Sequence, residues 1–131
     1  MQREIVTVPG WQPSKVLSPA VKAGGLVFTS VQNGRHPDTR LMDRDFESQA
    51  RQALRNLRTV LEAAGSTLDD VVRVTIHLTD SNNRPAFNEI YWEFFTGEQP
   101  ARASFGGIDL GVAAGLDVDA LVEVEAIAVA R

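Results

Sequence analysis

The chain has 131 residues, of which 44% are hydrophobic and 23% are charged, with a formal net charge of −4 and a pI near 5.1. This length suits one domain with its own core, so we expect a single domain over residues 1–131. The acidic balance argues against a nucleic-acid partner, because neutralising phosphates needs a concentrated basic surface. With no cysteine in the sequence, disulfides, thiolate metal sites and thiol nucleophiles are excluded.

The sequence predicts neither a membrane segment nor an export signal. No apolar run approaches the ~20 residues that a membrane span needs. The first residues, Met1 to Glu4, lack the apolar core of a secretion signal. We therefore expect a soluble, cytoplasmic protein without a membrane partner.

Short apolar runs bounded by turn residues predict three strands in the first third of the chain. The first lies within residues 3–8 and is followed by an irregular, proline-containing segment. Residues 20–22 and 26–31 predict a hairpin, because Gly24 and Gly25 supply a turn between them.

Two segments have the apolar spacing of helices. Asp45 to Ala64 predicts a long amphipathic helix that Gly65 ends, and a second helix is expected to begin within residues 82–85 and to end at Gly97. The expected buried stripes consist of Phe46, Ala50, Ala53, Leu54, Leu57, Val60, Leu61 and Ala64 in the first helix, and Phe87, Ile90, Tyr91 and Phe94 in the second.

The segment between these helices, residues 71–79, alternates and predicts a strand with an apolar and a polar face. The apolar face would hold Val72, Val74, Ile76 and Leu78, and the polar face Arg73, Thr75, His77 and Thr79. Two further strands are expected, from Arg102 and over residues 121–130. This order of strands and helices along the chain predicts an α+β fold with a mixed six-stranded sheet and both helices on one face. Because the other face of the sheet would carry apolar residues among the polar ones, burying it against identical subunits is more favourable than exposing it to water.

Arg102 is the most distinctive candidate for a binding site. Pro100 stiffens its approach, and an arginine held on a strand presents a fixed fork of donors that suits a carboxylate or phosphate. Ser104 would share its strand face. A structural ion pair is the alternative role for Arg102.

The other charged groups favour structural roles. Glu123 and Glu125 would lie on one strand face, ~7 Å apart, where they need partners such as Arg73 or raised pKa values. His77 has no second histidine at ligand spacing, so no metal site is expected. A basic stripe on the first helix alternates with acids at i,i+4 spacing, which indicates a solvated face and not a nucleic-acid site. The stripe consists of Arg44, Arg51, Arg55 and Arg58, with Glu47 and Glu62 as the expected partners of Arg51 and Arg58.

Seven stretches carry a further signal: SPAVKAGGLVFTS at 18–30, QARQALRNL at 49–57, LEAAG at 61–65, DDV at 69–71, NEIY at 88–91, PAR at 100–102 and VEVEAIAV at 122–129. Together they resemble the RidA family, also called the YjgF or reactive-intermediate deaminase family. The resemblance spans nearly the whole chain in one register. It implies a chorismate-mutase-like fold and a homotrimer whose sheets face inward, with three pockets between adjacent subunits.

The resemblance also implies an activity without metal or cofactor. Members of the 2-iminobutanoate/2-iminopropanoate deaminase type hydrolyse reactive enamines and imines to 2-oxo acids and ammonia. Carried over by position, Arg102 would bind the carboxylate of a small substrate and Glu123 would hold the attacking water. Ser30 and Asn88 would line the pocket.

Three positions depart from the family pattern. Leu17 stands where deaminating members have tyrosine, Val31 where they have glycine, and Ser104 where many have cysteine. These changes predict a tighter and more apolar pocket that keeps its anion site. Two alternatives to the deaminase therefore stay open: a pathway-specific hydrolase of a larger, apolar, amino-acid-derived substrate, and a non-catalytic trimeric protein that binds a small ligand.

Overall fold

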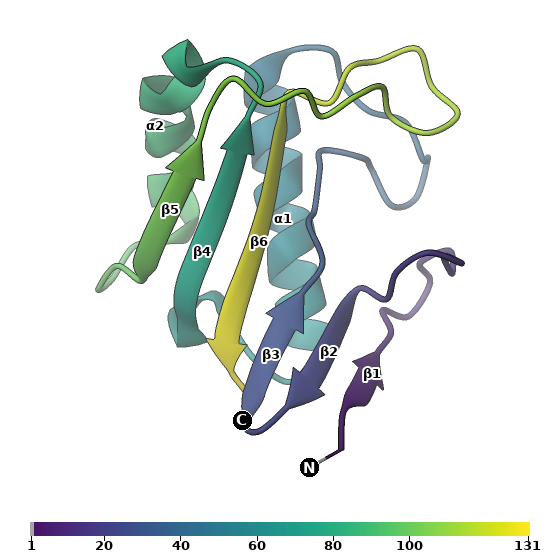
Figure 1. Cartoon of the computed structure of the whole chain (residues 1–131), viewed down its shortest axis with the longest axis vertical. Coiled ribbons are helices and arrows are strands. Elements are labelled where there is room, and N and C mark those ends of the chain that lie inside the picture. The colour runs from purple at the N-terminus through teal and green to yellow at the C-terminus, as the bar shows by residue number, and fades with distance from the viewer. Residues whose placement is uncertain (1) are drawn as a thin grey trace.

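The computed structural model describes residues 2–131 and places two helices against one face of a six-stranded sheet (Figure 1). The strands are β1 (Glu4–Val6), β2 (Ala20–Ala23), β3 (Leu26–Thr29), β4 (Val71–Leu78), β5 (Ala101–Phe105) and β6 (Val122–Val129). The helices are α1 (Phe46–Ala63) and α2 (Arg84–Phe94), with two 3-10 turns, η1 (Leu68–Asp70) and η2 (Ser81–Asn83). The predicted α+β fold is confirmed. Neither helix in this part of the chain is long and apolar enough to cross a membrane.

The sheet has the order β1-β2-β3-β6-β4-β5 and is mixed. Four neighbouring pairs are antiparallel, whereas β4 and β5 run parallel. A parallel pair needs a crossover, which α2 provides. β5 therefore forms one edge of the sheet and lies beside α2 (Figure 1).

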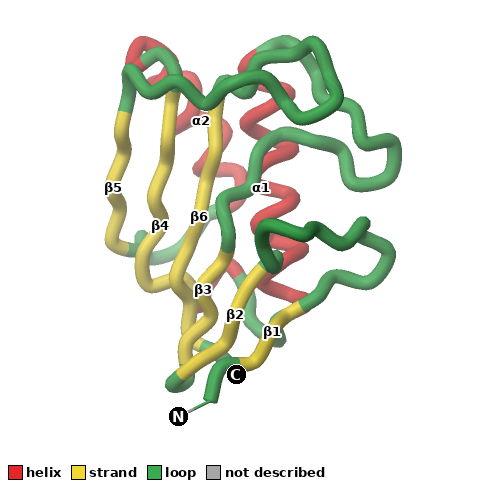
Figure 2. Tube along the Cα trace, turned by 45° about the vertical axis from the view of Figure 1, so that its right-hand side comes forward, coloured by secondary structure: helices red, strands yellow, loops and turns green. Residues whose placement is uncertain are grey.

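The longer helix begins and ends as its sequence predicts. The carboxylate of Asp45 accepts a hydrogen bond from the Ser48 amide at 2.9 Å and caps the first turn. Gly65 adopts a φ of 77°, which ends the helix in a conformation that glycine takes without strain. Figure 2 shows both helices on the same side of the sheet. Their buried side chains form one core with the sheet, whose largest members include Leu54, Leu57, Ile76, Phe87 and Tyr91.

Three details of the predicted faces are wrong, and the first is that Phe46 of α1 is only partly buried. Val72 was expected in the core, but a register irregularity between Val71 and Arg73 against β6 leaves Val71 7% exposed and Val72 44% exposed. In α2, Phe94 is only partly buried. Phe95, the first residue after the helix, is buried and stacks on Tyr91, with ring centroids 4.4 Å apart.

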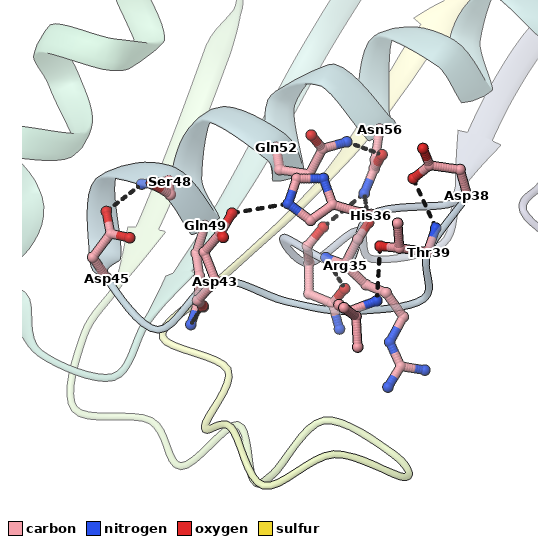
Figure 3. A network of polar contacts seen from close by, with 12 residues as sticks. Arg35, His36, Asp38, Thr39, Asp43, Asp45, Ser48, Gln49, Gln52 and Asn56 are labelled. Atoms are coloured by element: carbon pink, nitrogen blue, oxygen red, sulfur yellow. Dashed lines mark hydrogen bonds and ion pairs between the residues drawn. The ribbon is translucent and has the colours of Figure 1, made fainter.

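The loop between β3 and α1 is fixed by buried amides of the helix (Figure 3). Asn56 donates to the backbone oxygens of Asn33 and Arg35, at 3.0 and 2.8 Å, and accepts from Gln52 at 2.9 Å. Gly34 lies so close to α1 that a Cβ there would be 2.6 Å from the Gln49 Cα. The loop that follows β3 is therefore held against the helix by both hydrogen bonds and close backbone packing.

The face of the sheet opposite the helices carries polar and apolar side chains side by side. Among the described residues it is bare in both views (Figures 1 and 2). Alternation places Glu123 and Glu125 of β6 on this side, together with His77 of β4. The ring of Phe105 stacks on that of His77, with centroids 6.0 Å apart. Phe105 is half exposed, and so are other apolar side chains of this face such as Phe28.

Candidate functional site

Arg102 lies on the helix side of β5. It pairs in register with Val74, whose side chain is in the core, so both residues point toward the helix layer. Arg102 Nη2 donates to Asn88 Oδ1 at 2.5 Å. The guanidinium carbon lies 4.8 Å from the ring centroid of Tyr91 and 5.7 Å from that of Phe87. One amide and two aromatic faces of α2 therefore fix the orientation of this cation.

Arg102 is half-buried without a carboxylate partner. It takes part in none of the four ion pairs found within residues 2–131. Burial lowers the pKa of its guanidinium, as does the nearby Arg84, but an arginine stays charged in proteins. A charge that has lost water and gained no counterion is a favourable place for an anion from solution.

Ser104 extends this site along the strand. It pairs in register with the buried Ile76 and so shares the helix side with Arg102, as predicted. Its hydroxyl oxygen accepts a hydrogen bond from Arg84 Nε at 3.1 Å. Because that bond uses the oxygen as an acceptor, the Ser104 proton remains to be donated elsewhere.

Arg84 is a part of this site that the sequence interpretation missed. It is the first residue of α2 and stands four residues before Asn88, which puts both side chains on one helical face. This spacing was visible in the sequence, but nothing local indicated that this face would meet β5. We call the four residues Arg84, Asn88, Arg102 and Ser104 the basic half-site.

Glu123 lies on the other face of the sheet. It pairs in register with His77, while Glu125 Oε2 lies within hydrogen-bonding distance of His77 Nε2, at 3.1 Å. None of the ion pairs within residues 2–131 includes Arg73, which was an expected partner of these acids. Burial raises the pKa of Glu123, and Glu125 adds to this rise while His77 opposes it. Glu123 consequently binds a proton at a higher pH than an ordinary glutamate does.

Leu17, Ser30 and Val31 lie beyond β6, around the end of β3. Ser30 Oγ donates to the Ser18 carbonyl at 2.6 Å, which holds the N-terminal loop. A surface hollow of about 560 Å³ includes Leu17 and Ser30 in its lining, and a neighbouring one of about 360 Å³ includes Leu17 and Val31. Both apolar side chains are exposed, Leu17 by 47% and Val31 by 38%.

Val31 and Glu123 share the open face of the sheet. Gln32 and Val124 exchange backbone hydrogen bonds of 2.7 and 2.9 Å, and both side chains are buried. Residues next to such a pair point to the opposite side, which here is the open one. We call the set Leu17, Ser30, Val31 and Glu123 the acidic half-site.

One chain does not bring the predicted site residues into one pocket. Arg102, Asn88 and Ser104 meet on the helix side at the β5 edge. Glu123 lies on the opposite face, with β4 between β6 and β5. Within residues 2–131, no three His, Asp or Glu side chains gather in a way that could hold a metal ion.

The fold and the basic half-site define a small α+β protein with an oriented, unpaired arginine at a sheet edge. The family model described as Endoribonuclease L-PSP matches residues 10–130. The chain therefore belongs to that family, and the resemblance to RidA (YjgF) proteins is confirmed.

Individual relatives match over nearly their whole length. A RutC family protein of Pyrococcus horikoshii is 37% identical over 129 residues, which are 98% of each chain. The 2-iminobutanoate/2-iminopropanoate deaminase of Dermatophagoides farinae is 33% identical over 94% of this chain and 98% of its own. The crystal structure of Escherichia coli TdcF with bound serine superposes with a TM-score of 0.82 at 31% identity, covering 98% of this chain and 99% of TdcF.

Proposed function

We propose that this protein hydrolyses reactive enamines and imines to 2-oxo acids and ammonia, in pockets that neighbouring subunits of a homotrimer share. The observation that carries the proposal is Arg102, which Asn88 and two aromatic rings hold in place without any acidic partner. Such a cation suits the carboxylate of a small substrate. The names of relatives as deaminases support the same reaction class.

Each half-site supplies one part of the reaction. Arg102 binds the substrate carboxylate and thereby places the imine carbon. Glu123 accepts a proton as water adds to the carbon of the protonated imine, which gives a carbinolamine, and then returns that proton to the amine nitrogen. As the C–N bond breaks and ammonia leaves, Glu123 accepts the hydroxyl proton, so that the carbonyl of the 2-oxo acid forms, and this proton then passes to ammonia. The raised pKa of Glu123 suits a group that takes up and releases a proton in one cycle.

The separation of the half-sites supports shared pockets. In a closed ring, the interface joins two different surfaces of each copy, so the acidic half-site of one subunit can meet the basic half-site of the next. The same assembly would remove exposed apolar side chains of the open face from water, such as Phe28 and Phe105.

A small-molecule substrate explains the basic residues better than RNA does. On α1, Arg51 is bound by Glu93 through contacts of 3.1 and 2.7 Å, although Glu47 was its expected partner. Arg58 lies over the ring of Phe94 at 5.2 Å. Arg51 thus has an acidic partner and Arg58 an aromatic one within the fold, whereas Arg102 joins none of the ion pairs within residues 2–131.

The test is the rate at which the purified protein clears 2-iminopropanoate, generated in the cuvette by an amino-acid-oxidising enzyme. We expect acceleration above spontaneous hydrolysis that is lost in Arg102→Ala and kept in Arg55→Ala, a matched exposed arginine on α1. If the wild type binds pyruvate through Arg102 but does not accelerate hydrolysis, the non-catalytic alternative holds. Acceleration that survives Arg102→Ala would refute the site.

A further inference from the structure

Arg84 has hydrogen-bonding capacity that the fold does not use. Within residues 2–131 its only side-chain hydrogen bond runs from Nε to Ser104, and it joins none of the ion pairs found there. The two terminal nitrogens therefore keep their four N–H donors for another partner. The side chain is half-buried, so the missing partner is not fully replaced by water.

Close packing fixes Arg84 beside β5. Gly106 follows the strand, and a Cβ on it would lie 2.6 Å from Ser81 Cβ and 3.0 Å from Ser81 Cα in η2. The chain thus needs glycine at this position to let η2 and the end of β5 approach each other. Because α2 begins directly after η2, this approach places Arg84 within hydrogen-bonding distance of Ser104.

Two cations consequently stand in a row on one side of the edge strand. Arg102 and Ser104 are two residues apart, or ~7 Å along a strand, and Arg84 is bound at the Ser104 position. The charges are close enough for Arg84 to lower the pKa of Arg102, after the larger effect of burial. A ligand with one anionic group neutralises only one of the two arginines and leaves the positive charge of the other without a counterion. A ligand with an anionic group at each end neutralises both arginines.

We propose that the basic half-site selects substrates with two carboxylates, of the size of a glutamate-derived imine. Arg102 binds the carboxylate next to the imine, and Arg84 binds the one at the end of the side chain. Ser104 lies between them and donates its remaining proton to the ligand. This inference rests on the proposed function for its chemistry, but the recognition of two carboxylates can be measured without turnover.

The experiment compares two ligands of equal length. Imines from glutamate and norvaline differ in one terminal group, a carboxylate or a methyl, and so do the corresponding products 2-oxoglutarate and 2-oxopentanoate. We expect the wild type to favour the glutamate-derived imine by about tenfold or more in kcat/KM, as suits a charge-assisted hydrogen bond. In Arg84→Met, which keeps the side-chain stem, the ratio should fall to about one. Arg84→Lys, which keeps the charge but lacks the fork, should retain an intermediate ratio.

Binding of the two 2-oxo acids separates this inference from the deaminase proposal. One outcome is that neither imine is hydrolysed, that 2-oxoglutarate binds more tightly than 2-oxopentanoate, and that Arg84→Met removes this difference. This outcome would support dicarboxylate selection and refute the deaminase proposal. If the norvaline-derived imine is hydrolysed with no preference for either substrate, deamination stands and dicarboxylate selection is refuted. A folded Arg84→Met protein with an unchanged preference refutes it as well. Arg55→Met, an exposed change on α1, serves as the matched control that should leave the ratio unaltered.

Discussion

In the proposed site, the side chain of Asn88 affects which ligands Arg102 can bind. Its amide oxygen takes one guanidinium N–H without neutralising the cation, so the remaining donors keep their attraction for an anion. A carboxylate at this position would orient the guanidinium equally well but would pair with its charge. The neutral amide is therefore as important to the proposed site as the arginine.

Replacement of Asn88 by aspartate tests this distinction. Asn88→Asp keeps the acceptor and the size of the side chain, yet its ion pair with Arg102 should reduce kcat/KM by about a hundredfold. Asn88→Ala removes the acceptor and should reduce it by only about tenfold. Steady-state kinetics on 2-iminopropanoate would measure both, with Asn82→Ala as an exposed control. If the aspartate variant were the more active of the two, Asn88 would serve only to orient Arg102.

Glu123 should govern the acid limb of the pH profile. Burial raises its pKa, and the proposed reaction needs its ionised form, so kcat/KM should begin to fall at a higher pH than an ordinary glutamate would give. Glu123→Gln should abolish this activity at every pH. A profile limb at the usual glutamate pKa would contradict the role given to Glu123.

The same residue should make stability depend on pH. A carboxyl whose pKa is raised by folding stabilises the fold while it is protonated, and this contribution is lost as the pH rises through the folded-state pKa. Glu123→Gln stays neutral, so its melting temperature should exceed that of the wild type at about pH 8. The difference in melting temperature between the two proteins should be smaller at about pH 4, where the wild-type carboxyl is protonated. A glutamine variant that is less stable at the higher pH would show that the ionised carboxylate is favourably bound.

At the scale of elements, α1 holds two loops through a single buried side chain. Gln49 is fully buried and donates to the carbonyls of Asp43 and Asp119, both at 2.9 Å, while it accepts from the Leu121 amide at 2.8 Å. One amide thus joins the loop before α1 to the loop before β6. All of its hydrogen-bonding partners are backbone groups. If the amide is lost, these groups cannot rotate toward water as side chains can.

Gln49→Leu should therefore destabilise the protein strongly. It keeps the volume of the side chain but leaves three backbone groups without partners, and we expect a loss of about 3 kcal/mol in the free energy of unfolding. Gln52→Leu, one turn further along α1, breaks only the bond to Asn56 and should cost about 1 kcal/mol. Urea titrations would give both values, and equal losses would show that Gln49 does not fasten the two loops.

The elements themselves were predictable because their signals are local. Apolar spacing and the stop at Gly65 predicted Asp45–Ala64 for a helix that covers Phe46–Ala63, and Pro100 with Arg102 marked β5. The irregularity at Val72 was not predictable, because it depends on register with β6, a strand far away in the sequence. The ion-pair partner of Arg51 was not predictable either. It is Glu93 of α2 and not the expected Glu47, because α2 packs against α1.

The site was predictable only in part for the same reason. Alternation along β5 places Arg102 and Ser104 on one side, which needs no knowledge of other elements. That Arg84 meets Ser104, and that Glu123 lies on the opposite face of the sheet, follows from how α2 and β6 are placed around β4. Residue spacing within a segment contains no information about that arrangement.

At the scale of the whole molecule, the two half-sites lead to a test by mixing subunits. In the proposed homotrimer, the Arg102→Ala and Glu123→Gln variants should each be inactive. In a ring that contains both variants, one pocket joins an intact Arg102 to an intact Glu123. Random assembly from equal amounts makes about three in four trimers mixed, so refolding the variants together should restore about a quarter of the wild-type rate. Each variant refolded alone is the control, and no recovery would mean that pockets are not shared between subunits.

The placement of Arg102 and Glu123 on opposite faces of one sheet also has a consequence for inheritance. In the proposed ring, every subunit contributes to two pockets, so each subunit that is damaged at one half-site silences one pocket of its trimer. Each subunit that is damaged at both half-sites silences two pockets. An allele with both lesions would thus act dominantly over a normal allele in the same cell, even though its product folds and assembles normally.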